Sequence, residues 1–154
     1  SRRCGQGRLG GVSGDERRAI GLARGIARHF EDAGLASLAE FTVKNGRRAD
    51  VIALDAKGLF TIIEIKTSLA DFRSDNKWPE YLEFCDFYYF AVPEDFPQEV
   101  LPDEHGLIVA DRFDATILRQ SEEAPMNATR RKAQTLRFAM LAARRLREVT
   151  DPSV

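Results

Sequence analysis

The feature that most constrains this sequence is a nearly continuous apolar run interrupted by two charged residues. Residues 59–67 read Leu-Phe-Thr-Ile-Ile-Glu-Ile-Lys-Thr. Such a run is typical of a β-strand buried on both faces, and Glu64 and Lys66, two residues apart, then project from the same face. Burying either charge alone costs on the order of several kcal/mol, so each needs a charged partner. The run therefore predicts a central strand that carries either a buried ion pair or a functional site.

The rest of the sequence predicts an α/β fold, with elements in the order α-β-β-β-α-β followed by a hairpin and a last helix. Ser13 and Glu16 have the spacing of a capping box that starts the first helix, and Gly34 ends that helix. Pro79 breaks or restarts the second helix. The other predicted ranges are strands at 39–44, 48–54, 59–67 and 87–92, helices at 71–85 and 128–149, and a peripheral hairpin at 106–110 and 115–118.

Length and composition indicate one globular domain. The 154 residues suit a single domain, and 44% hydrophobic with 31% charged residues is typical of a globular chain. Residues 1–12, rich in Gly and Arg, are predicted to be a flexible tail, and residues 13–150 the single domain. Because the formal net charge is only −1, any binding to nucleic acid requires a local basic face.

Cysteine usage and hydropathy indicate a cytoplasmic protein without a membrane partner. Cys4 and Cys85 lack metal-ligand spacing and do not form the pattern of a disulfide framework. No apolar run reaches the length that spans a membrane, and the first residues lack the apolar stretch of a signal peptide.

An acidic residue followed two positions later by Lys occurs three times, so the pattern alone carries little information. Asp55-Ala56-Lys57 falls in a predicted turn, where Asp is expected for backbone reasons. Asp75-Asn76-Lys77 falls in a polar helical stretch, where we expect the charges to be solvated. Only Glu64-Ile65-Lys66 lies inside an apolar strand, and this position distinguishes it from the other two.

A second carboxylate is predicted beside this strand. Asp50 lies near the start of the preceding strand, and the short connection between the two strands brings Asp50 close to Glu64 and Lys66. Mg²⁺ prefers one or two carboxylates together with water and phosphate oxygens. Asp50, Glu64 and the carbonyl of Ile65 would supply such ligands, and Lys66 would orient the attacking water and offset charge on the phosphate. The group therefore predicts a metal-dependent phosphodiesterase site, with a buried ion pair as the alternative.

The same residues carry a resemblance to a known family. Asp50 with Glu64-Ile65-Lys66, in this element order, resembles the PD-(D/E)XK nuclease superfamily, although Ala49 replaces the usual Pro before the Asp. Four longer stretches are similar to bacterial MmcB-type DNA-repair proteins. These stretches are 47–50 (RRAD), 63–66 (IEIK), 77–81 (KWPEY) and 106–111 (GLIVAD).

The resemblance implies a restriction-endonuclease-like core and a DNA nuclease that acts in repair with Mg²⁺, for which Mn²⁺ is an expected substitute. It also implies DNA and other repair proteins as partners, and a cytoplasmic, nucleoid-associated location in a bacterium. One alternative is a catalytically weak or inactive nuclease-fold protein that binds DNA or acts as an adaptor. A scaffold that dimerises through the last helix is a third, weaker alternative.

Several residues are candidates for supporting roles. Lys77 and Tyr81 are four residues apart, the spacing of a Gln and a Tyr that face the site in RecB-like members of the superfamily. Trp78 is a candidate for stacking on a base, while core packing of Trp78 and Tyr81 and a solvated Lys77 are equally consistent with the sequence. Glu40 alternates away from its apolar neighbours and is a further candidate. Some members of the superfamily add a carboxylate from the first helix, which would be Glu16, but Glu16 has a sufficient role in the capping box.

Arginines form the candidate DNA-binding surface. Arg47 and Arg48 flank Asp50, and Arg130, Arg137 and Arg144 recur every seven residues along the last helix. Such a stripe suits a phosphate backbone, although a solvated helix face is about as consistent with it. His29 and His105 have no evident partners, and we assign neither of them a ligand role.

Overall fold

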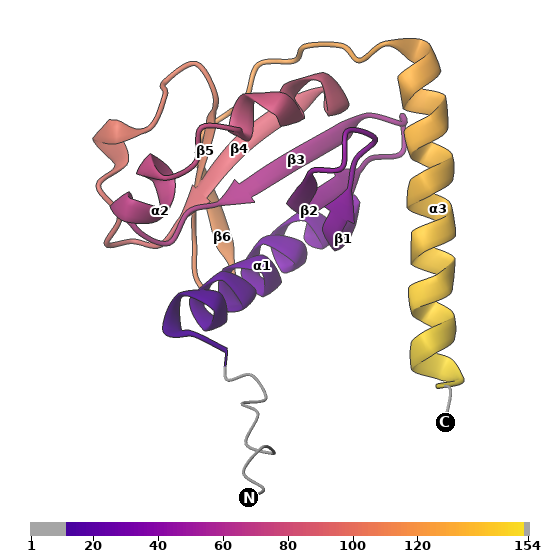
Figure 1. The fold of residues 1–154 in the computed structure, drawn as a ribbon, viewed down its shortest axis with the longest axis horizontal. Helices are drawn as coiled ribbons and strands as arrows, with labels where there is room; N and C mark the ends of the chain where they lie inside the picture. Colours follow the sequence, from indigo (N-terminus) through magenta and orange to yellow (C-terminus); the bar gives the residue numbers. More distant parts are fainter. Residues whose placement is uncertain (1–11, 153–154) are drawn as a thin grey trace, which may run out of the picture.

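A six-stranded mixed sheet forms the centre of the computed structural model, which describes residues 12–152 (Figure 1). The strands lie side by side in chain order, β1 to β6. The β3–β4 and β4–β5 pairs are parallel, and the other three pairs are antiparallel. The strands are β1 (Ala36–Thr42), β2 (Arg48–Leu54), β3 (Phe60–Ile65), β4 (Phe87–Val92), β5 (Gly106–Ala110) and β6 (Ala115–Arg119). The predicted α/β class with a mixed sheet is confirmed, whereas the predicted tail falls almost entirely outside the described residues.

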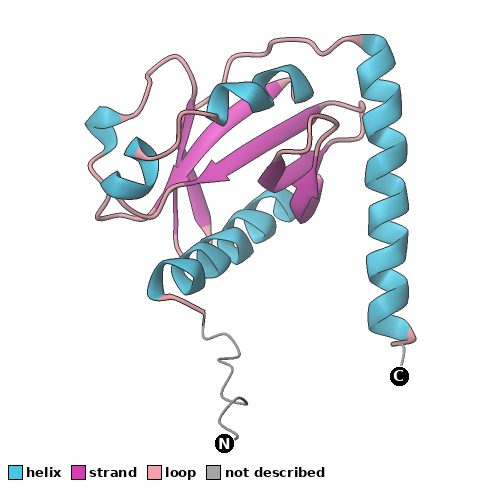
Figure 2. Cartoon of the chain, viewed as in Figure 1, coloured by secondary structure: helices cyan, strands magenta, loops and turns pink. Residues whose placement is uncertain are grey.

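Helical segments lie on both faces of this sheet (Figure 2). They are α1 (Gly14–Asp32), α2 (Leu69–Arg73), the 3₁₀ segments η2 (Trp78–Phe84) and η3 (Gln98–Val100), and α3 (Ala128–Thr150). The predicted capping box is present at the start of α1, with Ser13 and Glu16 bonded reciprocally. No helix of residues 12–152 combines the length and apolarity needed to cross a membrane.

Three sequence predictions differ from the structure. The predicted helix at 71–85 is wrong as one element, since α2 ends at Arg73 and η2 begins at Trp78, but the predicted restart at Pro79 is confirmed. Asp75 accepts the Lys77 N–H and Pro79 has no N–H to donate, so helical bonding does not continue through this stretch. The first strand starts at Ala36, three residues before the predicted start, because it pairs along all of β2. The hairpin is not peripheral, since β5 pairs with β4 and extends the main sheet.

Each face of the sheet has its own apolar core. On one face α1 buries Leu22, Ile26 and Phe30 against residues of β2 to β5. On the other face Phe84 and Phe138, from η2 and α3, pack against a second set of strand residues. Strand β3 contributes to both cores and is buried along its whole length, as the sequence predicts.

Helix α3 lies along the outside of the molecule (Figure 1) and buries only Gln134 and Phe138. Its first turns are fixed by an ion pair between Arg131 and Asp86, with N–O distances of 2.7 and 2.6 Å. Further along, Arg145 donates to the backbone carbonyls of β1. Helix α3 is therefore held to the sheet by the packing of Phe138 and by polar contacts on either side of it.

Candidate active site

Asp50 and Glu64 meet across the β2–β3 pair. The Asp50 N–H donates to Glu64 Oε1 at 3.1 Å, and the Ile65 N–H donates to Asp50 Oδ2 at 2.8 Å. The Glu64 side chain thus accepts a bond from the backbone of Asp50. The Asp50 side chain accepts one from the residue that follows Glu64. The juxtaposition of the two carboxylates agrees with the sequence prediction, while their chemical role stays a prediction.

The backbone is irregular where Asp50 faces β1. Glu40 has a φ of 53°, a left-handed conformation that is unusual for a residue other than glycine. In a regular strand, side chains three residues apart point to opposite faces of the sheet. Ala49 and Ile52 nevertheless both contact the core on the η2 face, so the alternation of side chains along β2 is interrupted around Asp50. The register across this point is unbroken, with Ala39 opposite Val51 and Phe41 opposite Ala49. Backbone strain of this kind clusters at functional sites.

Arg145 supports this irregular segment from α3. Its guanidinium donates to the carbonyl of Ala39 at 2.6 Å and to that of Glu40 at 2.9 Å. The Glu40 side chain turns outward, with Oε1 3.5 Å from Arg48 Nη1. Sequence reasoning considered the stripe of Arg130, Arg137 and Arg144 but missed Arg145, because only the fold brings its helix to β1.

Lys66 is buried and bound to a carboxylate that the sequence did not indicate. Its Nζ lies 2.6 Å from Asp75 Oδ2, and its side chain is 6% exposed. The expectation that Asp75 is solvated is therefore wrong. The sequence did indicate that Lys66 needs a charged partner, because burying an unpaired lysine is costly, but it did not indicate which residue this partner is.

Asp50 and Glu64 share an environment that disfavours negative charge. Burial raises the pKa of Asp50 from 3.8 to about 6. Burial, followed by the charge of Asp50, raises the pKa of Glu64 well above its usual value. Lys66 offsets this charge only in part, because its ammonium group is bonded to Asp75.

A bound divalent cation fits this donor set. Two carboxylates that disfavour each other's ionisation are stabilised by a hard cation between them, and oxygen ligands suit Mg²⁺. Among residues 12–152, no cluster of three or more His, Cys, Asp or Glu side chains has the arrangement of a metal site. The two carboxylates would therefore need the Ile65 carbonyl, water or substrate oxygens to complete the coordination.

A hollow between α1 and the first strands leads to Asp50. Its volume is about 530 Å³, and its lining includes Glu16, Glu40, Arg48, Asp50 and Ile65. Glu16 is exposed and accepts the Ser13 N–H at 3.3 Å as part of the capping box. Both further carboxylates considered from the sequence therefore border the hollow, one bonded in the helix cap and the other beside an arginine.

The candidate supporting residues on η2 divide between the site and the core. Tyr81 Oη donates to the Arg48 carbonyl at 2.7 Å, and burial and the charge of Glu64 raise its pKa. Lys77 is exposed. Trp78 stacks on Tyr88, with ring centroids 5.8 Å apart, so its ring lies among protein aromatics. The Tyr88 hydroxyl is buried and has no hydrogen-bond partner among the described residues.

The candidate DNA-binding arginines are mostly engaged in contacts within the protein. Arg47 pairs with Glu80 at 2.9 Å, and Arg130 pairs with Glu83 at 3.3 Å while lying over the ring of Phe84. Arg137 lines a small hollow near the start of α3. Arg144 is exposed.

Replacing Asp50 by Asn is expected to stabilise the metal-free protein at pH 7.5. Folding raises the pKa of Asp50 from 3.8 to about 6, so the folded protein holds this proton more tightly than the unfolded chain does. Wild-type stability therefore falls as the pH rises from the unfolded pKa through the folded pKa. The uncharged amide can still accept the Ile65 N–H and avoids this loss, a gain of about 1–3 kcal/mol. Thermal unfolding in EDTA at pH 5 and pH 7.5 measures the difference.

The exposed Asp103 supplies the control, because Asp103→Asn is expected to leave the melting temperature unchanged at both pH values. A lower melting temperature for Asp50→Asn at pH 7.5 would contradict the strained-charge interpretation.

The fold and this site define an α/β protein whose six-stranded mixed sheet, flanked by helices, is consistent with a restriction-endonuclease-like core. The sequence model of the MmcB-like DNA repair protein family matches residues 11–153. The chain therefore belongs to the MmcB-like DNA repair protein family.

A solved structure supports the fold. A protein of unknown function from Silicibacter pomeroyi is 45% identical in sequence to this chain and superimposes with a TM-score of 0.85. The match covers 92% of this chain and 94% of that one. A search of curated proteins gave no significant match. Membership of the family indicates a role in DNA repair.

Proposed function

We propose that this protein is a metal-dependent DNA nuclease of the PD-(D/E)XK type that acts in DNA repair. The observation that carries the proposal is the pair of carboxylates formed by the half-buried Asp50 and the buried Glu64, beside the buried ammonium of Lys66. A purely structural ion pair would match one acid to one base. Here two acids lie together, and the nearby base is bonded to a third acid, Asp75.

The proposed roles follow from position and charge. Asp50, Glu64 and the Ile65 carbonyl would hold Mg²⁺ or Mn²⁺ at the carboxyl end of β3. When bound, such an ion supplies a Lewis acid for the phosphate and acidifies a coordinated water. Lys66 would place its positive charge against the phosphoryl oxygens as negative charge grows on them. Asp75 acts as a positioning residue, because its bond fixes the Lys66 ammonium.

A DNA-binding or adaptor protein that keeps the nuclease fold without cutting is the second candidate. This function is favoured by the ion pairs of Arg47 and Arg130, because arginines that are paired within the protein are less available to bind a substrate phosphate. Calorimetric titration with Mn²⁺ separates the two functions. Binding that disappears in Asp50→Asn supports the nuclease, whereas absence of binding at millimolar metal supports the adaptor.

The test of the nuclease is a cleavage screen. The purified protein is incubated with single-stranded, duplex, flap and branched DNA in Mg²⁺, in Mn²⁺ and in EDTA. We expect at least one of these structures to be cut with metal and none in EDTA. A parallel set of RNA substrates defines whether the sugar matters. If all DNA structures stay intact with both metals, the proposed activity is wrong.

A further inference from the structure

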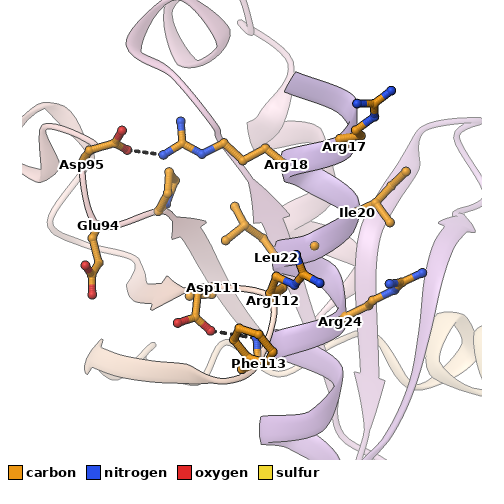
Figure 3. A pocket seen from close by; sticks show the side chains of 13 residues that line it. Arg17, Arg18, Ile20, Leu22, Arg24, Glu94, Asp95, Asp111, Arg112 and Phe113 are labelled. Carbon is orange, nitrogen blue, oxygen red and sulfur yellow. Dashed lines mark hydrogen bonds and ion pairs between the residues drawn. The ribbon is translucent and has the colours of Figure 1, made fainter. Parts of the chain in front are cut away.

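A second hollow lies along α1, next to the one that leads to Asp50. It has a volume of about 840 Å³ and lies between α1 and the loops that follow β4 and β5 (Figure 3). Ile20 and Arg24 line both hollows, so the outer side of α1 is a ridge between them. A chain that crosses this ridge passes from the second hollow toward Asp50.

The turn between β5 and β6 is fixed directly on α1. A Cβ atom at Gly25 would lie 1.9 Å from the Asp111 carbonyl oxygen, so only glycine permits this approach. One carboxylate oxygen of Asp111 accepts the N–H groups of Phe113 and Asp114 at 2.8 and 3.0 Å. Arg28 donates to the Arg112 carbonyl at 3.2 Å. The turn is thus held from inside and from the helix, which fixes the residues at its tip.

The tip presents an aromatic ring to solvent. Phe113 is 65% exposed, and the guanidinium of Arg112 lies over its ring, 5.3 Å from the centroid. Burying this ring elsewhere would be favourable, yet the anchored turn keeps it on the surface. An exposed ring beside a cation, on an anchored turn, offers a face on which unpaired bases stack in single-strand binders.

Charge on the ridge complements a phosphate chain. Figure 3 shows Arg17 and Arg24 projecting from the side of α1 away from Glu94 and Asp95. Within residues 12–152, neither of these two guanidinium groups, nor that of Arg112, makes an ion pair, whereas Arg18 pairs with Asp95 across the hollow. These three arginines supply positive charge that no ion pair within residues 12–152 neutralises, on the ridge and turn that border the acidic Glu94, Asp95 and Asp111.

We propose that this surface, Arg17, Arg24, Arg112 and Phe113, binds a single-stranded segment of nucleic acid, with phosphates on the arginines and a base on the Phe113 ring. A duplex keeps its bases stacked inside and offers none to the ring, so the surface favours a single-stranded end or flap. The proposal rests on the proposed function in one respect, namely that the strand bound here is delivered to Asp50.

The test is binding without metal. Fluorescence anisotropy in EDTA compares a labelled oligothymidylate of about 15 nucleotides with a duplex of the same length. Phe113→Leu is expected to weaken single-strand binding by roughly 5- to 100-fold, and Phe113→Tyr to retain most of it. Duplex binding stays unchanged in both variants, because it does not use the ring.

The arginines are tested by salt dependence. The double variant Arg17→Gln, Arg24→Gln is expected to lower the slope of log affinity against log salt by roughly 1.4 for the single strand. Lys57→Gln, which removes one positive charge elsewhere, is the control, since Lys57 is exposed in the turn before β3, at the opposite end of that strand from Glu64. It is expected to leave the slope unchanged.

Several outcomes of these binding measurements would overturn the proposed single-strand surface. It fails if the wild type does not bind the single strand, if Phe113→Leu binds it as well as the wild type does, or if the double variant keeps the full slope. An equal loss of single-strand and duplex binding in Phe113→Leu also overturns base stacking. Because these measurements exclude metal, a failure of cleavage with intact binding contradicts only the nuclease assignment, and the reverse result contradicts only this surface.

Discussion

Replacing Glu64 by Gln is expected to reduce DNA cleavage by roughly 10²- to 10³-fold without destabilising the protein. Gln has the shape of Glu, and its carbonyl oxygen can still accept the Asp50 N–H. The change removes a buried charge whose pKa is raised by burial and by Asp50. Loss of activity with retained or increased stability marks a residue kept for function at a cost in stability.

Cleavage rates, Mn²⁺ calorimetry and melting temperature should be measured on the same preparation. Glu83→Gln is the matched control, because Glu83 is exposed on η2 and pairs with Arg130 of α3, not with the site residues. We expect the control to cut and to bind metal as the wild type does. If Glu64→Gln cuts normally, or if its activity falls only in parallel with its stability, Glu64 is a structural residue.

The Asp86→Ala variant is expected to be less stable than the wild type by about 3–5 kcal/mol, because it leaves Arg131 without its partner in a largely buried site. The Asp86 side chain is fully buried and accepts bonds from the backbone of Phe60 and Met126 as well as from Arg131. It therefore joins β3, the segment before α3 and α3 itself. For a domain of this size the melting temperature should fall by roughly 10 °C.

The effect of Asp86 has a defined pH dependence. Burial alone would raise its pKa, but the hydrogen bonds from Arg131 and from two backbone N–H groups outweigh burial and lower the pKa below 3.8. A lowered pKa contributes stability above the unfolded value and loses it as pH falls toward the folded value. Wild-type stability should therefore decline below about pH 4, and the decline should be shallower in Asp86→Ala.

Urea unfolding between pH 3 and pH 7 measures both effects. Asp95→Ala is the control, because the Arg18–Asp95 pair is exposed and such pairs contribute at most about 1 kcal/mol. An Asp86→Ala protein as stable as this control would contradict the role given to Asp86.

Much of the sheet was predictable because its strands follow local rules. The apolar run of β3 and the turn signals around β2 place Glu64 beside Asp50 without any long-range information. The start of β1 was missed because pairing with β2, not residue preference, determines it. In the 71–85 segment the break at Pro79 was predictable, but the end of α2 at Arg73 was not, because the Asp75 side chain accepts the Lys77 N–H in place of helical bonding.

The parts of the site that depend on tertiary contacts were not predictable. Lys66 pairs with Asp75, nine residues away, because α2 folds back over the end of β3. The ring of Trp78 lies against Tyr88 instead of solvent because η2 packs on β4. The sequence indicates no role for Gly25 beyond that of a helix residue, whereas in the fold it permits the close approach of the β5–β6 turn to α1. In each case a partner in another element of the fold decides the role.

The most direct test of the central claim is the Mg²⁺- or Mn²⁺-dependent cleavage of DNA by the wild type and by three single variants. The variants are Asp50→Asn, Glu64→Gln and Lys66→Met, each first shown to be folded. The nuclease assignment predicts that the wild type cuts at least one DNA structure and that each variant loses that activity. Cleavage that persists at the wild-type rate in all three variants would contradict it.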